Sequence, residues 1–192
     1  MRDNVRFLGG FLRGPGRVGA VAPSSRFLAR EMVKGCSLRI AKTVVELGPG
    51  TGSFTREIAN DISDETTFLA LERDPVFART IERRFPEVLV YNDSAERLPH
   101  YLALNGKACA DCIVSGLPWA SFPRALQVRI LEAVVASLSP GAPFVTFAYI
   151  HALWLPAAQR FRRTLHDCFS KVEQSPVVWA NIPPAFVYRC RR

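Results

Sequence analysis

A short stretch from residue 44 to 59, VVELGPGTGSFTREIA, brings an acidic residue and three glycines together. An apolar run ends at Glu46, Gly48, Gly50, Thr51 and Gly52 follow it, and a helical pattern begins after them. Glycine allows a sharp turn and lets ligand atoms approach the backbone, while a helix start attracts carboxylate or phosphate groups. This order of residues predicts a strand, a ligand-binding loop and a helix.

The spacing of these glycines limits the kind of ligand. The loop G-P-G-T-G is not the G-x-G-x-x-G of dinucleotide-binding proteins, and no Gly-Lys-Ser/Thr follows it as in a P-loop. A dinucleotide or a nucleoside triphosphate is therefore disfavoured. A tight turn that binds nothing remains open as an alternative at this point.

Two more acidic residues close the next two apolar runs. Glu72 ends the run TFLALE, and Asp93, followed by Ser94, ends the run VLVYND. A carboxylate at Glu72 can accept both hydroxyls of a ribose, Asp93 can accept an adenine amine, and Glu46 can meet an ammonium group. Each acid alone is compatible with a helix cap or a solvated strand end. Together they predict S-adenosylmethionine as the ligand.

Apolar runs alternate with helical patterns from residue 43 onward, which predicts an α/β fold with a mostly parallel sheet and helices on both faces. The last two strands follow each other closely and should form an antiparallel hairpin at one edge. The expected strands are 43–48, 67–72, 88–94, 110–118, 143–149, 172–180 and 185–190. The expected helices are 53–60, 75–85, 124–138 and 156–169.

The composition is that of a globular domain. The chain has 192 residues, of which 48% are apolar and 22% charged. It shows no run long enough to span a membrane and no convincing secretory signal, so we expect it in the cytoplasm. The five cysteines are scattered, which fits free thiols. Cys109 and Cys112 form a C-x-x-C without a second ligand pair, so we expect no metal.

The charge is unevenly distributed over a chain of net charge +8. Residues 1–42 hold nine Lys/Arg and two acidic residues, and residues 160–192 hold seven Lys/Arg and two acidic residues. Between them, residues 43–159 hold nine Lys/Arg and thirteen acidic residues. Basic ends around an acidic centre suggest an anionic partner, either nucleic acid or a membrane surface. A basic surface that serves only solubility is the alternative.

Residues 1–42 precede the alternation and form a separate N-terminal segment, with residues 43–192 as the catalytic domain. A helix over residues 1–13 would be basic and amphipathic, which suits a membrane interface. Packing of its apolar side on its own domain is the alternative. That side holds Val5, Phe7, Leu8, Phe11 and Leu12, and the opposite side holds Arg2, Arg6 and Arg13. A second short helix should follow APSS, capped by Ser24 or Ser25.

Several stretches carry a resemblance to a known family. The glycine loop, LERD and NDSAERL resemble the motifs of the seven-stranded, Rossmann-like S-adenosylmethionine-dependent methyltransferases. More narrowly, the chain resembles the bacterial phospholipid N-methyltransferases over residues 18–189. The stretches that carry this likeness are VGAVAPSSRFLAREMV, VVELGPGTGSFTREI, SGLPWASFP, FVTFAY and NIPPAFVYR.

The resemblance implies methyl transfer to the amine of phosphatidylethanolamine, towards phosphatidylcholine, with S-adenosylhomocysteine as product. It implies peripheral attachment to an anionic inner membrane. Backbone carbonyls of the loop from Ser115 through Gly116 and Leu117 would orient the amine, and Trp119 or Tyr149 would face the methylated ammonium. Trp119 as a core or lid aromatic, and Tyr149 as a packing residue, remain alternatives. His151 is a candidate proton acceptor, and Asn181, Pro183 and Pro184 would form a stiff loop over the pocket.

Two other functions remain open. The chain also resembles the ribosomal RNA adenine N6-dimethylases, which carry Asn-Leu-Pro-Tyr where this chain has Ser115 to Trp119. The asparagine that holds the target amine in those enzymes is absent here, as is room for their RNA-binding domain. A protein that binds S-adenosylmethionine or anionic surfaces without catalysis is the third reading.

Overall fold

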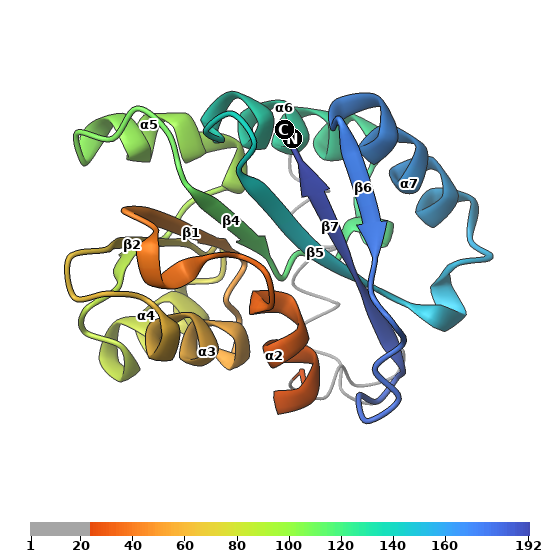
Figure 1. Cartoon of the computed structure of the whole chain (residues 1–192), viewed down its shortest axis with the longest axis horizontal. Coiled ribbons are helices and arrows are strands. Elements are labelled where there is room, and N and C mark those ends of the chain that lie inside the picture. The colour runs from red at the N-terminus through yellow and green to blue at the C-terminus, as the bar shows by residue number, and fades with distance from the viewer. Residues whose placement is uncertain (1–23) are drawn as a thin grey trace.

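The computed structural model describes residues 24–192, whose strands form one seven-stranded sheet (Figure 1). The order across the sheet is β3-β2-β1-β4-β5-β7-β6. The first five strands run parallel, and β7 pairs antiparallel with both β5 and β6. The strands are β1 (Thr43–Leu47), β2 (Thr67–Leu71), β3 (Leu89–Tyr91), β4 (Cys112–Ser115), β5 (Pro143–Tyr149), β6 (Lys171–Gln174) and β7 (Ala185–Arg191). The expected parallel sheet with an antiparallel pair at one edge is confirmed.

Helices cover both faces of this sheet, as Figure 1 shows. One face packs on α2, α3 and α4, and the other on α5, α6 and α7. The helices are α2 (Arg26–Val33), α3 (Ser53–Asp61), α4 (Pro75–Arg84), α5 (Leu98–Leu104), α6 (Arg124–Ser137) and α7 (Pro156–Cys168). The Rossmann-like architecture predicted from the sequence is therefore confirmed.

Strand β1 lies near the middle of the sheet and is buried on both sides. Its side chains alternate, so that Val45 and Leu47 join the apolar cluster under α5 to α7 while Val44 joins the cluster under α2 to α4. By the same alternation Glu46 faces the α2–α4 side. All five residues of β1 are buried, and Glu46 is the only charged one among them.

The helix starts follow the expected capping chemistry. Ser25 caps α2, and its hydroxyl accepts a hydrogen bond of 3.2 Å from the backbone N–H of Leu28. Asp74 caps α4, and Pro75 occupies its first turn. Helix α2 packs its buried residues Leu28 and Met32 into the same cluster as β1. The expected helix over residues 1–13 lies outside the described residues.

Two elements differ from the sequence expectation. Helix α5 is additional, because its seven residues, with a proline at the start, give too short a pattern to stand out. The expected strand 172–180 ends at Gln174. Pro176 has no N–H to contribute to a ladder. Beyond Gln174 the pairing continues through the Ser175 N–H, which donates to the Val187 carbonyl at 2.9 Å, and through an isolated bridge between Val178 and Ala185. Within residues 24–192, no helix is both long enough and apolar enough to cross a bilayer.

Candidate active site

The glycine loop joins β1 to α3 at the carboxyl edge of the sheet. Gly48, Gly50 and Gly52 have φ angles of 71°, 54° and 83°, which side chains disfavour. A Cβ atom at Gly48 would lie 2.7 Å from the Leu117 Cδ2 atom, whereas one at Gly50 would meet no atom within 4 Å. The loop is therefore packed on one side and open at Gly50, where a ligand can approach the backbone.

Glu46 lies directly beneath this loop with no solvent exposure. Both of its carboxyl oxygens lack a hydrogen-bond partner within residues 24–192, as does the hydroxyl of the neighbouring Thr55. Burial raises the pKa of Glu46 to about 8, Glu72 adds to the rise, and the proximity of Thr55 opposes it. A buried carboxyl without partners is unfavourable, so this position favours a cationic ligand.

Glu72 immediately follows β2 and is also buried. Its carboxylate accepts hydrogen bonds from the backbone N–H of Gly50 at 3.0 Å and of Asp74 at 2.9 Å. Burial raises the pKa of Glu72, and these backbone hydrogen bonds oppose the rise. Glu72 thus fixes the open part of the glycine loop, while its remaining lone pairs can accept hydroxyl groups.

Asp93 and Ser94 lie just after β3. The Asp93 carboxylate accepts hydrogen bonds from the Ser94 N–H at 2.7 Å and the Tyr101 hydroxyl at 2.8 Å. Partial burial raises the pKa of Asp93, but these two hydrogen bonds and the Arg97 charge outweigh it and leave the pKa below its usual value. Ser94 caps the turn that follows and donates its hydroxyl to Glu96. The acid is held ionised, as acceptance from an amine requires.

A second loop, the Ser115–Trp119 loop after β4, packs against the glycine loop. The Gly116 N–H donates to the Leu47 carbonyl at 2.8 Å. A Cβ atom at position 116 would lie only 2.6 Å from the Gly48 carbonyl oxygen, so a larger residue cannot fit without moving the backbone. The two loops expected to bind donor and acceptor are therefore in direct contact.

Ser115 organises this second loop from within the protein. Its hydroxyl accepts a hydrogen bond from the Trp119 indole N–H at 3.1 Å, and its carbonyl accepts one from the Thr146 hydroxyl at 3.1 Å. Trp119 is 2% exposed and stacks on Phe161 with ring centroids 4.7 Å apart. In this structure Trp119 is thus a core aromatic that positions Ser115, which was the alternative reading of that residue.

Tyr149 and His151 lie at the carboxyl end of β5. Tyr149 is half-buried, burial raises the pKa of its hydroxyl, and its ring stacks on His151 with centroids 5.6 Å apart. The His151 side chain is exposed. The pair forms an aromatic wall at the same edge as the two loops.

The connection between β6 and β7 is tied to the start of α2. Asn181, which is buried, accepts a hydrogen bond of 2.9 Å from the Ser25 N–H and donates one of 2.7 Å to the Pro183 carbonyl. These contacts hold Ser25 beside the connection from β6 to β7. The sequence motif predicts a stiff loop at these residues, but it does not predict the hydrogen bond between Asn181 and Ser25.

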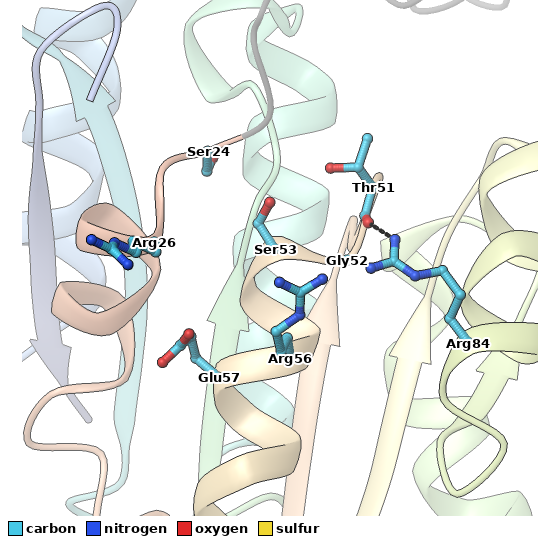
Figure 2. Close-up of a pocket in the computed structure, with 8 residues that line it drawn as sticks. All are labelled: Ser24, Arg26, Thr51, Gly52, Ser53, Arg56, Glu57 and Arg84. Atoms are coloured by element: carbon cyan, nitrogen blue, oxygen red, sulfur yellow. Dashed lines mark hydrogen bonds between the residues drawn. The ribbon is translucent and has the colours of Figure 1, made fainter. Parts of the chain in front are cut away.

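A basic cavity of about 320 Å³ lies on the outer side of the glycine loop (Figure 2). Arg26, Arg56 and Arg84 line it, together with the start of α3 and one acidic residue, Glu57, so its lining carries more positive than negative charge. Arg84 donates to the Thr51 carbonyl at 2.6 Å, and Figure 2 shows the Arg56 side chain directed towards the same end of α3. Helix α3 has no acid in its first turn and no side-chain cap, so its positive end adds to this charge.

Sequence reasoning did not single out Tyr101 or these arginines. Tyr101 belongs to the unexpected helix α5, and its bond to Asp93 spans eight residues. Arg56 and Arg84 come from two helices, so only the tertiary structure brings them together. In residues 24–192 no group of three or more His, Cys, Asp or Glu side chains is arranged to hold a metal ion.

The geometry fits a ligand with an ammonium, a ribose and an adenine. Unpartnered carboxyl oxygens at Glu46, open backbone at Gly50 and acids at Glu72 and Asp93 follow one another along the carboxyl ends of β1, β2 and β3. Open parallel sheets bind ligands at this edge. The Ser115–Trp119 loop closes the β4 side, where an acceptor molecule would meet the donor.

Among known proteins, a curated relative and several solved structures resemble the chain, although no family model matches it. A curated relative, the ornithine lipid N-methyltransferase of Singulisphaera acidiphila, is 35% identical over 194 residues, which cover 100% of this chain and 97% of the relative.

Solved structures share the fold. The N-methyltransferase NodS of Bradyrhizobium japonicum WM9 has a TM-score of 0.64 at 14% identity, covering 87% of this chain and 92% of that one. The O-methyltransferase TomG of Streptomyces achromogenes, solved in complex with S-adenosylmethionine, has a TM-score of 0.65 at 17% identity, covering 99% of this chain and 90% of that one. Since its likeness to the curated relative extends over its whole length, the chain belongs to the same family of class I S-adenosylmethionine-dependent N-methyltransferases, with S-adenosylmethionine as its methyl donor.

Proposed function

We propose that this protein methylates the amine of a membrane lipid head group, and that ornithine lipid is its first substrate. The observation that carries this proposal is the 35% identity over the whole chain to an enzyme named for that activity. The amine of phosphatidylethanolamine is the second candidate, supported by the phospholipid N-methyltransferase resemblance of the S-G-L-P and N-x-P-P-A stretches. Both lipids present an amine beside an acidic group.

The residues divide the work between donor and acceptor. Glu46 binds the donor's ammonium, Glu72 its ribose hydroxyls and Asp93 its adenine amine. The bound donor supplies an electrophilic methyl group on a sulfonium. The chain contributes mainly by aligning the amine with that group, because a fixed in-line geometry removes much of the barrier.

The acceptor amine is held by the Ser115–Trp119 loop. The carbonyls of Ser115 and Leu117 already accept hydrogen bonds from Thr146 and Trp119, whereas the Gly116 carbonyl accepts none from residues 24–192. We assign the Gly116 carbonyl to the amine N–H. A neutral amine is required for attack, and His151 takes up the proton that leaves.

Tyr149 supports the later methyl transfers. Each added methyl removes a hydrogen-bond donor from the nitrogen and leaves a bulkier cation. An aromatic face attracts such a cation by about 1–2 kcal/mol when it is desolvated. Tyr149 lies at the end of β5, beside His151, where it can present its ring to the product.

The enzyme acts at the cytoplasmic face of an anionic membrane, where its lipid substrate is found. The basic N-terminal segment contributes to this attachment through Arg2, Arg6 and Arg13, at about 1 kcal/mol for each arginine near the surface. Deleting residues 1–13 should therefore weaken sedimentation with anionic vesicles. Unchanged sedimentation would argue against that role.

Labelled S-adenosylmethionine tests the substrate directly. The purified full chain is incubated with micelles that contain ornithine lipid, phosphatidylethanolamine or neither, and the lipid extract is chromatographed. Label should appear in methylated ornithine lipid first. Label in RNA but in no lipid would favour the adenine methyltransferase alternative, and bound donor without any labelled product would favour the non-catalytic one.

A further inference from the structure

Large apolar side chains lie exposed at the carboxyl edge of the sheet, beside the site. Trp154 is 83% exposed and Leu155 50%, in the connection from β5 to α7, while Trp179 is 73% and Ile182 79% exposed between β6 and β7. We refer to Trp154, Leu155, Trp179 and Ile182 as the apolar rim. Two largely exposed tryptophans at one edge of the sheet are unusual on a surface that faces only water.

The two connections that carry the apolar rim are joined to each other. The Ile150 N–H donates to the Pro184 carbonyl at 3.0 Å, at the point where β5 ends and β7 begins. Asn181 connects the second of them to the start of α2. Figure 1 shows both connections and α2 at the same end of the sheet. The apolar rim therefore belongs to one surface, which also borders Tyr149.

Positive charge accompanies the apolar rim at this edge. Arg26 begins α2, next to the Ser25–Asn181 contact, and it lines the basic cavity with Arg56 and Arg84. The Arg26 guanidinium lies 5.0 Å from the ring centroid of Phe27, which is itself exposed. Tryptophan and arginine side chains together suit the head-group layer of a membrane, where an indole has apolar and polar neighbours and an arginine meets lipid phosphates.

We propose that the apolar rim inserts into the head-group layer of an anionic membrane and holds the opening of the active site against it. This inference rests on the proposed function, because a lipid substrate has to reach the Ser115–Trp119 loop from the bilayer. It assigns membrane contact to the catalytic domain itself, in addition to the N-terminal segment. The Arg26 side of the surface contacts anionic head groups, and the Trp154 and Trp179 rings enter below them.

Tryptophan fluorescence of the full chain tests the insertion. The chain has three tryptophans, and only Trp119 is buried. Vesicles of phosphatidylglycerol and phosphatidylcholine should shift the emission to the blue, and brominated lipids should quench it. A Trp154→Ala/Trp179→Ala variant should lose both responses. An unshifted wild-type emission with vesicles would overturn the proposal.

Co-sedimentation with the same vesicles tests the surface with a matched control. Ile182→Asp should weaken vesicle binding about tenfold, since it places a charge where the proposal has an apolar side chain entering the bilayer. Ile40→Asp is the control. It changes an 83% exposed isoleucine just before β1, at the amino edge of the sheet, and its vesicle binding should stay within about twofold of the wild type. Equal losses in both variants would overturn the proposal. Unchanged donor affinity, measured by calorimetry, shows that both variants are folded.

Other occupants of the apolar rim give different results. The tryptophan emission could already be blue-shifted without vesicles and could shift to the red when residues 1–13 are deleted. That result would mean that the N-terminal segment covers the apolar rim. A dimer in light scattering that Ile182→Asp dissociates would assign it to a second copy. Either result overturns the proposal.

The proposed function and this inference can fail separately. If Ile182→Asp methylates lipid in detergent micelles but only slowly on vesicles, both hold. If lipid is methylated and the rim variants bind vesicles normally, the inference fails alone. If no lipid is methylated while the rim variants still lose vesicle binding, the proposed function fails and the docking surface stands.

Discussion

Gly116 packs so tightly on Gly48 that a Cβ atom at position 116 would lie 2.6 Å from the Gly48 carbonyl oxygen. The loop after β4 and the loop after β1 are therefore set at a fixed distance by two residues that lack side chains. This contact couples the position of the Ser115–Trp119 loop to that of the glycine loop, which we propose bind the acceptor and the donor.

Gly116→Ala should disturb both loops, because the atom in its way is backbone and cannot rotate aside. We expect a loss of about 1–3 kcal/mol in the free energy of unfolding and a larger loss in methyl transfer, since small displacements of aligned groups can reduce the rate about a hundredfold. Thermal unfolding and initial rates measure the two effects. Gly106→Ala is the control: its φ of 67° disfavours a side chain and so costs stability, but its Cβ would meet nothing within 4 Å and would displace no loop of the site. Equal rates in the two variants would contradict the coupling.

Glu46→Gln should weaken donor binding. The buried carboxylate is the one group in the described site whose two oxygens have no partner, and a neutral amide cannot balance an ammonium. We expect about a tenfold to hundredfold rise in the dissociation constant by calorimetry. Glu65→Gln, at an exposed position between α3 and β2, should leave the constant unchanged. If both variants bind the donor like the wild type, Glu46 does not contact it.

The stability of the donor-free protein should fall as the pH rises from about 4.5 to about 8. Burial raises the pKa of Glu46 from 4.5 to about 8, so in this window the folded state keeps a proton that the unfolded chain releases. The free energy of unfolding then decreases with pH, by on the order of a few kcal/mol over the window. Chemical denaturation at several pH values measures the slope, which Glu46→Gln should reduce. A steeper slope in that variant would contradict the assignment.

Tyr149 should matter more for the second and third methyl transfers than for the first. Tyr149→Phe keeps the aromatic face and should retain activity within a few-fold, whereas Tyr149→Leu removes a contribution of about 1–2 kcal/mol, or roughly tenfold in rate. The ratio of mono-, di- and trimethylated lipid gives the readout. Identical product ratios in the two variants would show that the ring packs without facing the product.

Asn181→Ala should release the β6–β7 connection from α2. It leaves the Ser25 N–H without its acceptor, and we expect a loss of about 1–3 kcal/mol in the free energy of unfolding. Asn181→Asp keeps the acceptor for Ser25 but loses the donor to the Pro183 carbonyl. It should therefore lie between the alanine variant and the wild type in thermal unfolding. An alanine variant as stable as the wild type would contradict the role of this contact.

The sequence predicts what depends on local pattern. Buried parallel strands appear as apolar runs, glycines mark the turn at the end of β1, and acids at the strand ends place Glu46, Glu72 and Asp93 on one edge of the sheet, where the structure has them. Contacts between distant segments leave no such pattern. The bond from Ser25 to Asn181 joins residues 156 positions apart, and nothing in either residue identifies the other.

Burial of a single side chain is equally hard to read from sequence. Trp119 belongs to a loop motif that the resemblance associates with the acceptor, yet its ring packs on Phe161 and its N–H is used by Ser115. The sequence alone does not distinguish a tryptophan that faces a ligand from one that packs in the core. Short helices are also hard to predict, because seven residues, the length of α5, are too few to show a clear helical periodicity.

The place of β7 has a consequence for biosynthesis. It is made after β6 yet lies between β5 and β6, and it pairs with β5 along seven residues. Until β7 has been synthesised, the β5 edge that it covers has no neighbour, and an uncovered edge can recruit strands from other nascent chains. Arg189 on the same strand also reaches Glu31 of α2 at 2.7 Å, so the earliest described helix is held in part by a strand that is synthesised long after it. The sheet can therefore close only once β7 has been synthesised, and until then the free edge of β5 is a site at which nascent chains could associate.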